Sequence, residues 1–414
     1  MVKLADADKR ILDGEQGEVK RKALELLLTL ARIYDADSLV PVGSAHINGA
    51  SVMAIGEAGV GFVEEMASDG ASIVIPATTN PKSLALADKD VGLDPAQATA
   101  QRRLSAALHK MGAQVCSSCT PYLVGNVPAR GQSIAWAESS AIVYANSVLG
   151  ARSNREGGPT AIASAILGKT IRMGYHLDEN RAGTLLVQVR KPLSGTTAYG
   201  TLGYFVGGIA KDGVPVFEGL PPSVTADELK MLSAALATAG SVAMFHIVGV
   251  TPEAQTREQA FRGRKPPAVL EYGNLEEAAA VSALTRSGSD RTEWVTLGCP
   301  HFSVSEFAHA ASLLAGQKIS SEVMLWINSS APVASQAAKL GYIGIIEEAG
   351  GEIVCETCPV HIAGRVFARR QNITNLTTNS AKMAHYAFGQ LGLYPRYGTI
   401  DECIRAAITG SWNA

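Results

Sequence analysis

WVTLGCP, at residues 294–300, is an apolar strand that ends in a glycine, a cysteine and a proline. Two other apolar segments end in a similar way, because the pairs Cys116-Ser-Ser-Cys119 and Cys355-Glu-Thr-Cys358 each follow a strand and precede a proline. Helical segments alternate with strands around all three, which is typical of parallel α/β units. Open parallel sheets bind ligands beyond the carboxyl ends of their strands, so the cysteines lie where a site is expected.

The same alternation extends along the chain and predicts its elements. Strands are expected near 39–42, 72–76, 113–116, 242–249, 293–297, 322–327 and 352–355. Helices are expected near 18–34, 51–67, 92–111, 135–149 and 159–168, and from a Thr225–Glu228 capping box to Gly240. The segment 184–219, which contains LLVQVR near its start and has seven glycines between 195 and 219, favours β structure. Pro221-Pro222 divides the chain into two expected lobes, 1–220, with two subdomains, and 221–414.

Composition excludes several function classes. The 414 residues carry 36 Lys and Arg against 38 Asp and Glu, which gives no electrostatic basis for binding nucleic acid or an anionic membrane. The best candidate for a membrane span, 231–252, is divided by Gly240 and is better interpreted as a helix followed by a buried strand. The charged N-terminal segment has no signal-peptide core. We expect a soluble, cytoplasmic protein.

The six cysteines allow four interpretations on their own. They are an iron–sulfur site with ligands from three places, a zinc site from the two CxxC pairs, buried free thiols, or redox chemistry of one pair. A site with three ligands would leave one iron open, and that iron could act as a Lewis acid on a substrate hydroxyl.

Polar groups follow several of the predicted strands and helices. The candidate residues for a site are His46, Asn48, Thr79, Asn80, Glu138, Ser139, Asn154, Arg155, Glu156, Asn379, Ser380 and Lys382. Arg155 suggests a cleft for a carboxylate or phosphate, and Asn379 to Lys382 open a helix, which is a natural anion site. Turn chemistry, helix capping and solvated loops are the alternatives.

Six motifs, taken together and in order, resemble the large subunit of aconitase X, a divergent branch of the aconitase superfamily. They are GSAHINGAS (43–51), SSCTPYLVG (117–125), IAWAESSAIVYANSVLGARSNREGGP (134–159), TLGCPHFSVSE (296–306), ETCPV (356–360) and TTNSAKMAHY (377–386). Smaller motifs, YHLDENR (175–181) and HIVGVTPEA (246–254), agree. The similarity runs from about residue 4 to residue 410.

This resemblance implies an aconitase-like fold of several α/β domains around a central iron–sulfur cluster, of the 4Fe–4S type or smaller. The implied ligands are Cys119, Cys299 and Cys358, which leaves the other three cysteines as non-ligands. The implied activity is that of a hydro-lyase acting on a small hydroxy acid. We expect cis-3-hydroxy-L-proline as substrate, with mevalonate 5-phosphate as the alternative; a non-catalytic iron-sensing or binding protein is an alternative of another class.

In this interpretation the twelve candidate residues surround the substrate. Arg155 and Lys382 hold the carboxylate, with Ser380 and Asn379 adding hydrogen bonds. The loops at 46–48 and 79–80 line the opposite wall, and the two glutamates orient the substrate. The catalytic base of the superfamily is a serine on a swivelling domain that has no counterpart here, so no catalytic residue is assigned to this chain. We therefore expect a small second subunit that supplies the serine.

Overall fold

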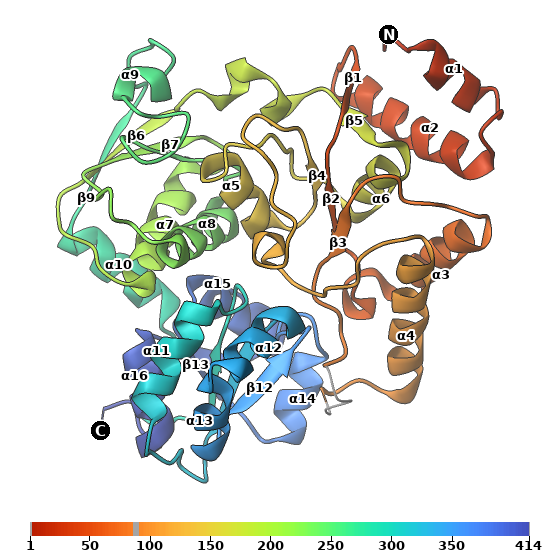
Figure 1. Cartoon of the computed structure of the whole chain (residues 1–414). Coiled ribbons are helices and arrows are strands. Elements are labelled where there is room, and N and C mark those ends of the chain that lie inside the picture. Colours follow the sequence, from red (N-terminus) through yellow and green to blue (C-terminus); the bar gives the residue numbers. More distant parts are fainter. Residues whose placement is uncertain (1, 86–90, 414) are drawn as a thin grey trace.

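The computed structural model describes residues 2–85 and 91–413, which form three regions, each built around its own sheet or sheets (Figure 1). The first region contains a parallel sheet of order β3-β2-β4 and an antiparallel pair, β1 with β5. Its elements are α1 (Asp6–Leu12), α2 (Glu18–Ile33), β1 (Leu39–Pro41), β2 (Ala45–Ile47), α3 (Val52–Ser68), β3 (Ala77–Thr79), α4 (Pro95–Lys110), β4 (Ala135–Trp136), α5 (Ser139–Ser147), α6 (Gly158–Leu167) and β5 (Lys169–Ile171).

The second region is a four-stranded parallel sheet of order β8-β7-β6-β9 with its helices. Its elements are β6 (Leu185–Val189), α7 (Thr196–Ala210), β7 (Pro215–Glu218), α8 (Ala226–Gly240), β8 (His246–Ile247), α9 (Arg257–Ala260), β9 (Val269–Tyr272) and α10 (Asn274–Leu284). Strands from both sides of Pro221-Pro222 thus pair in one sheet.

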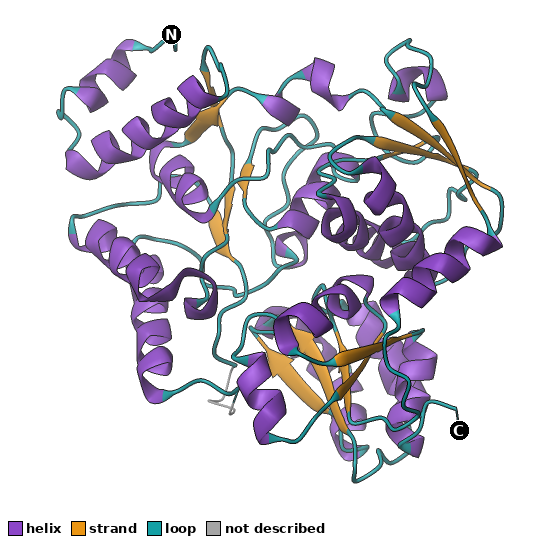
Figure 2. Cartoon of the chain, turned by 180° about the vertical axis from the view of Figure 1, so that it is seen from behind, coloured by secondary structure: helices purple, strands orange, loops and turns teal. Residues whose placement is uncertain are grey.

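The third region is a five-stranded parallel sheet of order β12-β11-β10-β13-β14, with helices on both faces (Figure 2). Successive side chains of a strand enter opposite cores: Val295 and Leu325 pack on one face, Trp294 and Trp326 on the other. Its elements are β10 (Trp294–Leu297), α11 (Val304–Leu314), β11 (Met324–Ser329), α12 (Ala331–Lys339), α13 (Tyr342–Glu348), β12 (Glu352–Cys355), α14 (Gly364–Arg370), β13 (Asn375–Thr378), α15 (Ala381–Tyr386), β14 (Tyr394–Tyr397) and α16 (Ile400–Thr409).

The α/β class with mainly parallel sheets is confirmed, but three strand predictions need correction. The prediction at 72–76 is wrong, because the backbone N–H groups of Ile73 and Val74 donate to Met111 and Ala165 rather than to a strand. The strand near 113–116 is reduced to one bridge between Thr78 and Gln114, and that predicted at 242–249 to His246–Ile247. Within the described part of the chain, no helix is long and apolar enough to cross a membrane.

The β interpretation of 184–219 is confirmed for β6 and β7 but is wrong between them, where Thr196–Ala210 form helix α7. Its glycines allow α7 to lie directly against α8. A Cβ at Gly203 would come within 2.7 Å of the Leu232 carbonyl oxygen, and one at Gly207 within 3.0 Å of the Leu236 carbonyl oxygen. The glycines of this segment, which suggest β structure in the sequence, are therefore explained by the close packing of two helices.

Gly203→Ala is expected to destabilise the protein by about 1–3 kcal/mol, because the added methyl group forces the two helix backbones apart. Gly208→Ala is the matched control, since that position of the same helix has no atom within 4 Å of the added Cβ. The control should be neutral or stabilising by up to about 1 kcal/mol through helix propensity. Urea unfolding measures both, and equal stabilities of the two variants would contradict this packing.

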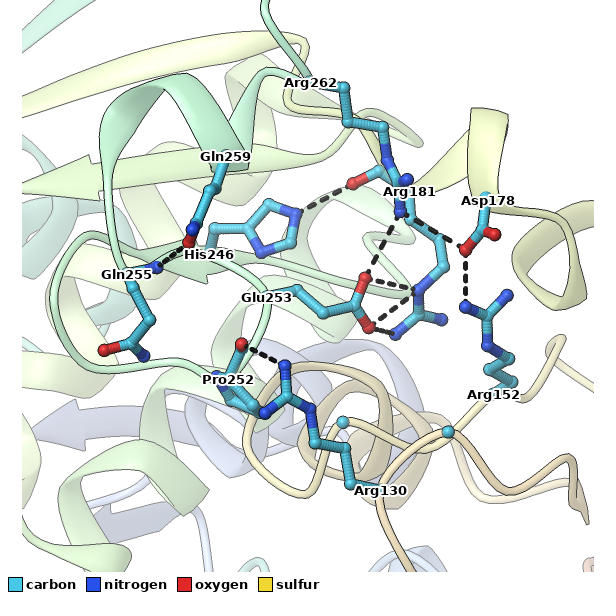
Figure 3. A pocket seen from close by; sticks show the side chains of 12 residues that line it. Arg130, Arg152, Asp178, Arg181, His246, Pro252, Glu253, Gln255, Gln259 and Arg262 are labelled. Carbon is cyan, nitrogen blue, oxygen red and sulfur yellow. Dashed lines mark hydrogen bonds and ion pairs between the residues drawn. The ribbon is translucent and has the colours of Figure 1, made fainter.

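A buried arginine joins the second region to the first. Arg181 is fully buried and donates to the Glu253 carboxylate (Figure 3). It also donates to the carbonyl oxygens of Asn146, Ala151 and Tyr175. Arg181 and Glu253 line a polar pocket of about 490 Å³. A buried charge must be paired, so the contacts fix how the two regions meet. The two smaller sequence motifs, 175–181 and 246–254, therefore have a structural role at this junction.

Candidate functional site

Three cysteines come together where the first and third regions meet. Cys119 follows the bridge at Gln114, Cys299 follows β10, and Cys358 follows β12. All three are buried; the charges of Cys299 and Cys358 act on Cys119, and that of Cys299 acts on Cys358. The backbone N–H of His301 donates to the Cys119 Sγ at 3.3 Å, which joins the two loops directly.

The other three cysteines lie apart from this set. Cys116 donates to the Thr79 carbonyl oxygen at 3.5 Å, Cys355 is the last residue of β12, and Cys403 is buried in α16. All six are free thiols. The described contacts of these other three cysteines are therefore local ones, whereas the charges of Cys299 and Cys358 act on Cys119.

Three buried thiols are the type of donor that binds iron–sulfur clusters, although burial keeps these thiols protonated while no metal is bound. Burial raises the pKa of Cys119 well above its usual range, and burial with the charge of Cys299 raises the pKa of Cys358 to about 12. The thiols alone therefore hold their protons, and a metal must displace these protons to bind. In the described residues, no three His, Cys, Asp or Glu side chains converge tightly enough to hold a single metal ion.

A largely buried ion pair lies beside the cysteines. Lys382, in the first turn of α15, donates to the Glu138 carboxylate and to the Ser140 hydroxyl, both at 2.8 Å. Glu138 is also the N-cap of α5 and accepts from the Ala141 N–H at 2.7 Å. Burial opposes the charge of both groups, but their pairing dominates: it raises the pKa of Lys382 and lowers that of Glu138. The site thus holds one fixed cation next to one fixed anion.

The ends of β2 and β3 and the residues that follow them form another side of the site. The His46 Nδ1 lies 2.8 Å from the Thr78 hydroxyl, which also accepts from the Asn126 amide at 2.9 Å. Burial lowers the pKa of His46 to about 4, so the ring is neutral. The Asn80 amide donates to the Asn48 side-chain oxygen at 3.2 Å. Thr79 faces the cysteine loop, where its hydroxyl accepts from the Ser117 N–H at 3.2 Å.

Asn379 and Ser380 close the site from the third region. The Ser380 hydroxyl donates to the Cys299 carbonyl oxygen and accepts from the Met383 N–H at 3.1 Å as the N-cap of α15. It therefore holds the cysteine loop against the helix that carries Lys382. Around the site, several buried polar atoms have no hydrogen-bond partner in the structure: His46 Nε2, Asn80 Oδ1, Ser117 Oγ, His301 Nδ1 and Asn379 Oδ1. Such groups are normally satisfied, so they mark places for water or a ligand.

The candidates at 154–156 have their contacts elsewhere. The Arg155 side chain is exposed and donates to the Ser241 carbonyl oxygen at 2.8 Å. Asn154 binds the Met173 carbonyl and the Tyr175 N–H, and Glu156 accepts from the Thr170 hydroxyl at 3.1 Å. Burial raises the pKa of Glu156. The structure does not bring these three residues together with the cysteines.

Sequence reasoning missed several residues of the site. Ser140 binds Lys382, whereas the chosen neighbour, Ser139, is half-buried at the start of α5. His361 is three residues beyond Cys358, and its pKa is lowered to about 4 by burial and by Lys382. The sequence could have indicated His361, because it lies close to the Cys358 motif. Thr78 and Asn126 carry no signal of their own, because their role depends on contact with His46.

Models of the three domains of aconitase X match this sequence over nearly its whole length. The first domain matches residues 1–179, the second 183–281 and the third 292–409. The chain belongs to the aconitase X family. The crystal structure of Thermococcus kodakaraensis aconitase X in its holo-form is similar, with a TM-score of 0.88 and 35% identity, covering 98% of this chain and 100% of that one.

Curated aconitase X relatives carry two different activity names. The phosphomevalonate dehydratase large subunit of Methanothermobacter thermautotrophicus is 41% identical and covers 98% of each chain. The cis-3-hydroxy-L-proline dehydratase of Pseudomonas aeruginosa is 37% identical over 97% of this chain but only 69% of its own length. Both are dehydratases, and this aconitase X is accordingly a hydro-lyase, as the sequence predicted.

Proposed function

We propose that this chain is the large subunit of a two-subunit dehydratase that uses an iron–sulfur cluster on Cys119, Cys299 and Cys358. The observation that supports this proposal most strongly is that three buried thiols from two regions lie together beside the Lys382–Glu138 ion pair. When bound, such a cluster with an open iron supplies a Lewis acid for the departing hydroxyl group. The fold supplies binding, orientation and exclusion of water.

The Lys382–Glu138 pair supports cis-3-hydroxy-L-proline as the substrate. This molecule carries a carboxylate and a protonated ring nitrogen at neutral pH, so it presents one charge of each sign. Lys382 would bind the carboxylate and Glu138 the ammonium group, each as a charge-assisted hydrogen bond. Lys382 is favoured over Arg155 as the carboxylate partner because Arg155 is exposed and donates to Ser241.

Mevalonate 5-phosphate is the second candidate, because a relative of matching length carries that activity name at 41% identity. It has no ammonium group and adds a phosphate, which would need a further cation. Lys82 lies on the loop after β3 and pairs with Glu356 at 2.5 Å, beside the Cys358 loop. It is the residue we assign to the phosphate if this substrate is used.

The proton-abstracting base is assigned to a small partner subunit. Elimination of water requires a base as well as an acceptor for the hydroxyl group. Several relatives are named large subunits, which supports a partner of this kind. Glu138, which is paired with Lys382, and the neutral His46 are orienting groups in this scheme, since each is held by fixed contacts.

The test combines the cluster-reconstituted chain with an aconitase X small subunit and offers both substrates under anaerobic conditions. We expect dehydration of cis-3-hydroxy-L-proline by the pair and at least about 100-fold less by the chain alone, as general base catalysis contributes ~10²–10⁴-fold. If the enzyme dehydrates only mevalonate 5-phosphate, that molecule replaces cis-3-hydroxy-L-proline as the proposed substrate. Full activity of the lone chain would refute the two-subunit proposal, and a cluster without any turnover would favour an iron-sensing role.

A further inference from the structure

We infer that Lys230 is a positioning residue for the cluster site, acting through the peptide backbone of His301. This inference rests on the proposed function, because it assumes that Cys119 is a cluster ligand. Lys230 lies in α8 of the second region and is not on any cysteine loop. Its side chain is only 1% exposed, which is exceptional for a lysine and requires a set of partners.

One of those partners is the residue that contacts Cys119. The Lys230 ammonium donates to the His301 carbonyl oxygen at 3.3 Å, while the N–H of the same residue donates to the Cys119 Sγ at 3.3 Å. His301 is thus held from both sides, by Lys230 at its carbonyl and by Cys119 at its amide. Hydrogen bonds to the sulfur atoms of an iron–sulfur cluster tune the reduction potential and the stability of that cluster. The orientation of His301 therefore affects a cluster bound by Cys119.

Two carboxylates keep Lys230 in place. Asp227 lies 3.0 Å from the ammonium, and Glu306 forms a second, closer ion pair with it. Ser303 connects the two acids: its hydroxyl donates to Asp227 at 2.8 Å, and its N–H donates to Glu306 at 2.9 Å. Ser303 is also the N-cap of α11, which begins directly after the Cys299 loop. The network therefore fixes both the helix and the loop that leads into it.

A purely structural ion pair is the competing explanation. Such a pair would need only the two carboxylates, and its loss would reduce the stability of the protein with or without a cluster. The contact with the His301 carbonyl goes beyond that need, because it places the charge on the residue whose N–H touches the Cys119 sulfur. The two explanations differ in what happens to the bound cluster when the fold is intact.

The experiment uses Lys230→Met combined with Glu306→Gln, so that no unpaired carboxylate is left at Glu306. The amide oxygen introduced by Glu306→Gln can still accept from the Ser303 N–H, as glutamine does in a capping box. After anaerobic reconstitution, we expect cluster loss in air, followed by visible absorption, to be about 10-fold faster than in the wild-type protein, in line with losses of outer-shell partners. The reduction potential should become more negative.

Three variants separate the explanations. Glu306→Gln alone keeps Lys230 with Asp227 as its partner and should lose its cluster more slowly than the double variant. Lys230→Arg keeps a charged donor and should restore most of the cluster lifetime, which covers the case in which the double variant fails to fold. Lys169→Met removes a partly buried lysine paired with Asp8 at 2.6 Å, remote from the cysteines, and should change only stability.

The outcomes are distinct. A wild-type protein that takes up no cluster would overturn both the proposed function and this inference. A wild-type cluster together with unchanged loss rate and potential in the folded double variant would overturn the inference alone. Equal acceleration by Lys169→Met would assign the effect to general stability and would also overturn it.

Discussion

Anaerobically reconstituted protein should lose its brown colour when Cys119, Cys299 or Cys358 is replaced by serine. These three thiols are the buried set that meets where the first and third regions join, and each would supply one ligand. With only three ligands available, loss of any one leaves too few to retain a cluster. Iron content and visible absorption of the purified variants measure the effect, which we expect to be near-complete loss.

Two other cysteines provide the controls for this experiment. Cys403→Ser should keep the colour, because Cys403 lies in α16 away from the three thiols. Cys116→Ser is the more demanding control, since Cys116 is in the same CxxC pair as Cys119 but donates to Thr79 instead. If Cys119→Ser keeps its iron and Cys116→Ser loses it, then Cys116, rather than Cys119, is the ligand. A stoichiometric zinc signal without iron would reject the cluster altogether.

The fold class could be predicted because parallel strands leave a strong local pattern. The strands near 293–297 and 322–327 are almost entirely buried, and that near 352–355 is buried in its second half, so their apolar runs are clear in the sequence. Segment 72–76 is equally apolar, yet its backbone hydrogen bonds go to the ends of helices. Helix α7 was missed because its glycines serve contact with α8, and a sequence does not show such a contact.

The site could be predicted where its residues belong to strand ends. The cysteine loops follow strands or a bridge, and residues 46–48 and 79–80 lie at the carboxyl ends of β2 and β3, so position along the chain indicates them. The ion pair between Glu138 and Lys382 could not be predicted from position along the chain, because 244 positions separate the two residues. The same is true of Lys230, whose contact with His301 crosses from the second region to the third.

Lys382→Met is expected to lower kcat/KM of the reconstituted two-subunit enzyme by roughly 30- to 4,000-fold, which corresponds to about 2–5 kcal/mol for truncating one partner of a buried charge pair. The loss has two physical sources. The substrate carboxylate would lose its cation, and Glu138 would remain buried without its partner at 2.8 Å. The second source also affects folding, so the single variant alone cannot separate binding from stability.

Glu138→Gln combined with Lys382→Met separates these two sources. The double variant leaves no unpaired charge and keeps an acceptor for the Ala141 N–H at the start of α5, so it should regain stability in urea unfolding. It should not regain activity, because the cation that binds the carboxylate is still absent. The matched control is Lys191→Met, which breaks a partly buried pair with Glu277 in the second region and should leave kcat/KM within about threefold of the wild type. A folded double variant with wild-type kcat/KM would remove Lys382 from the site and, with it, the reason for preferring a zwitterionic substrate.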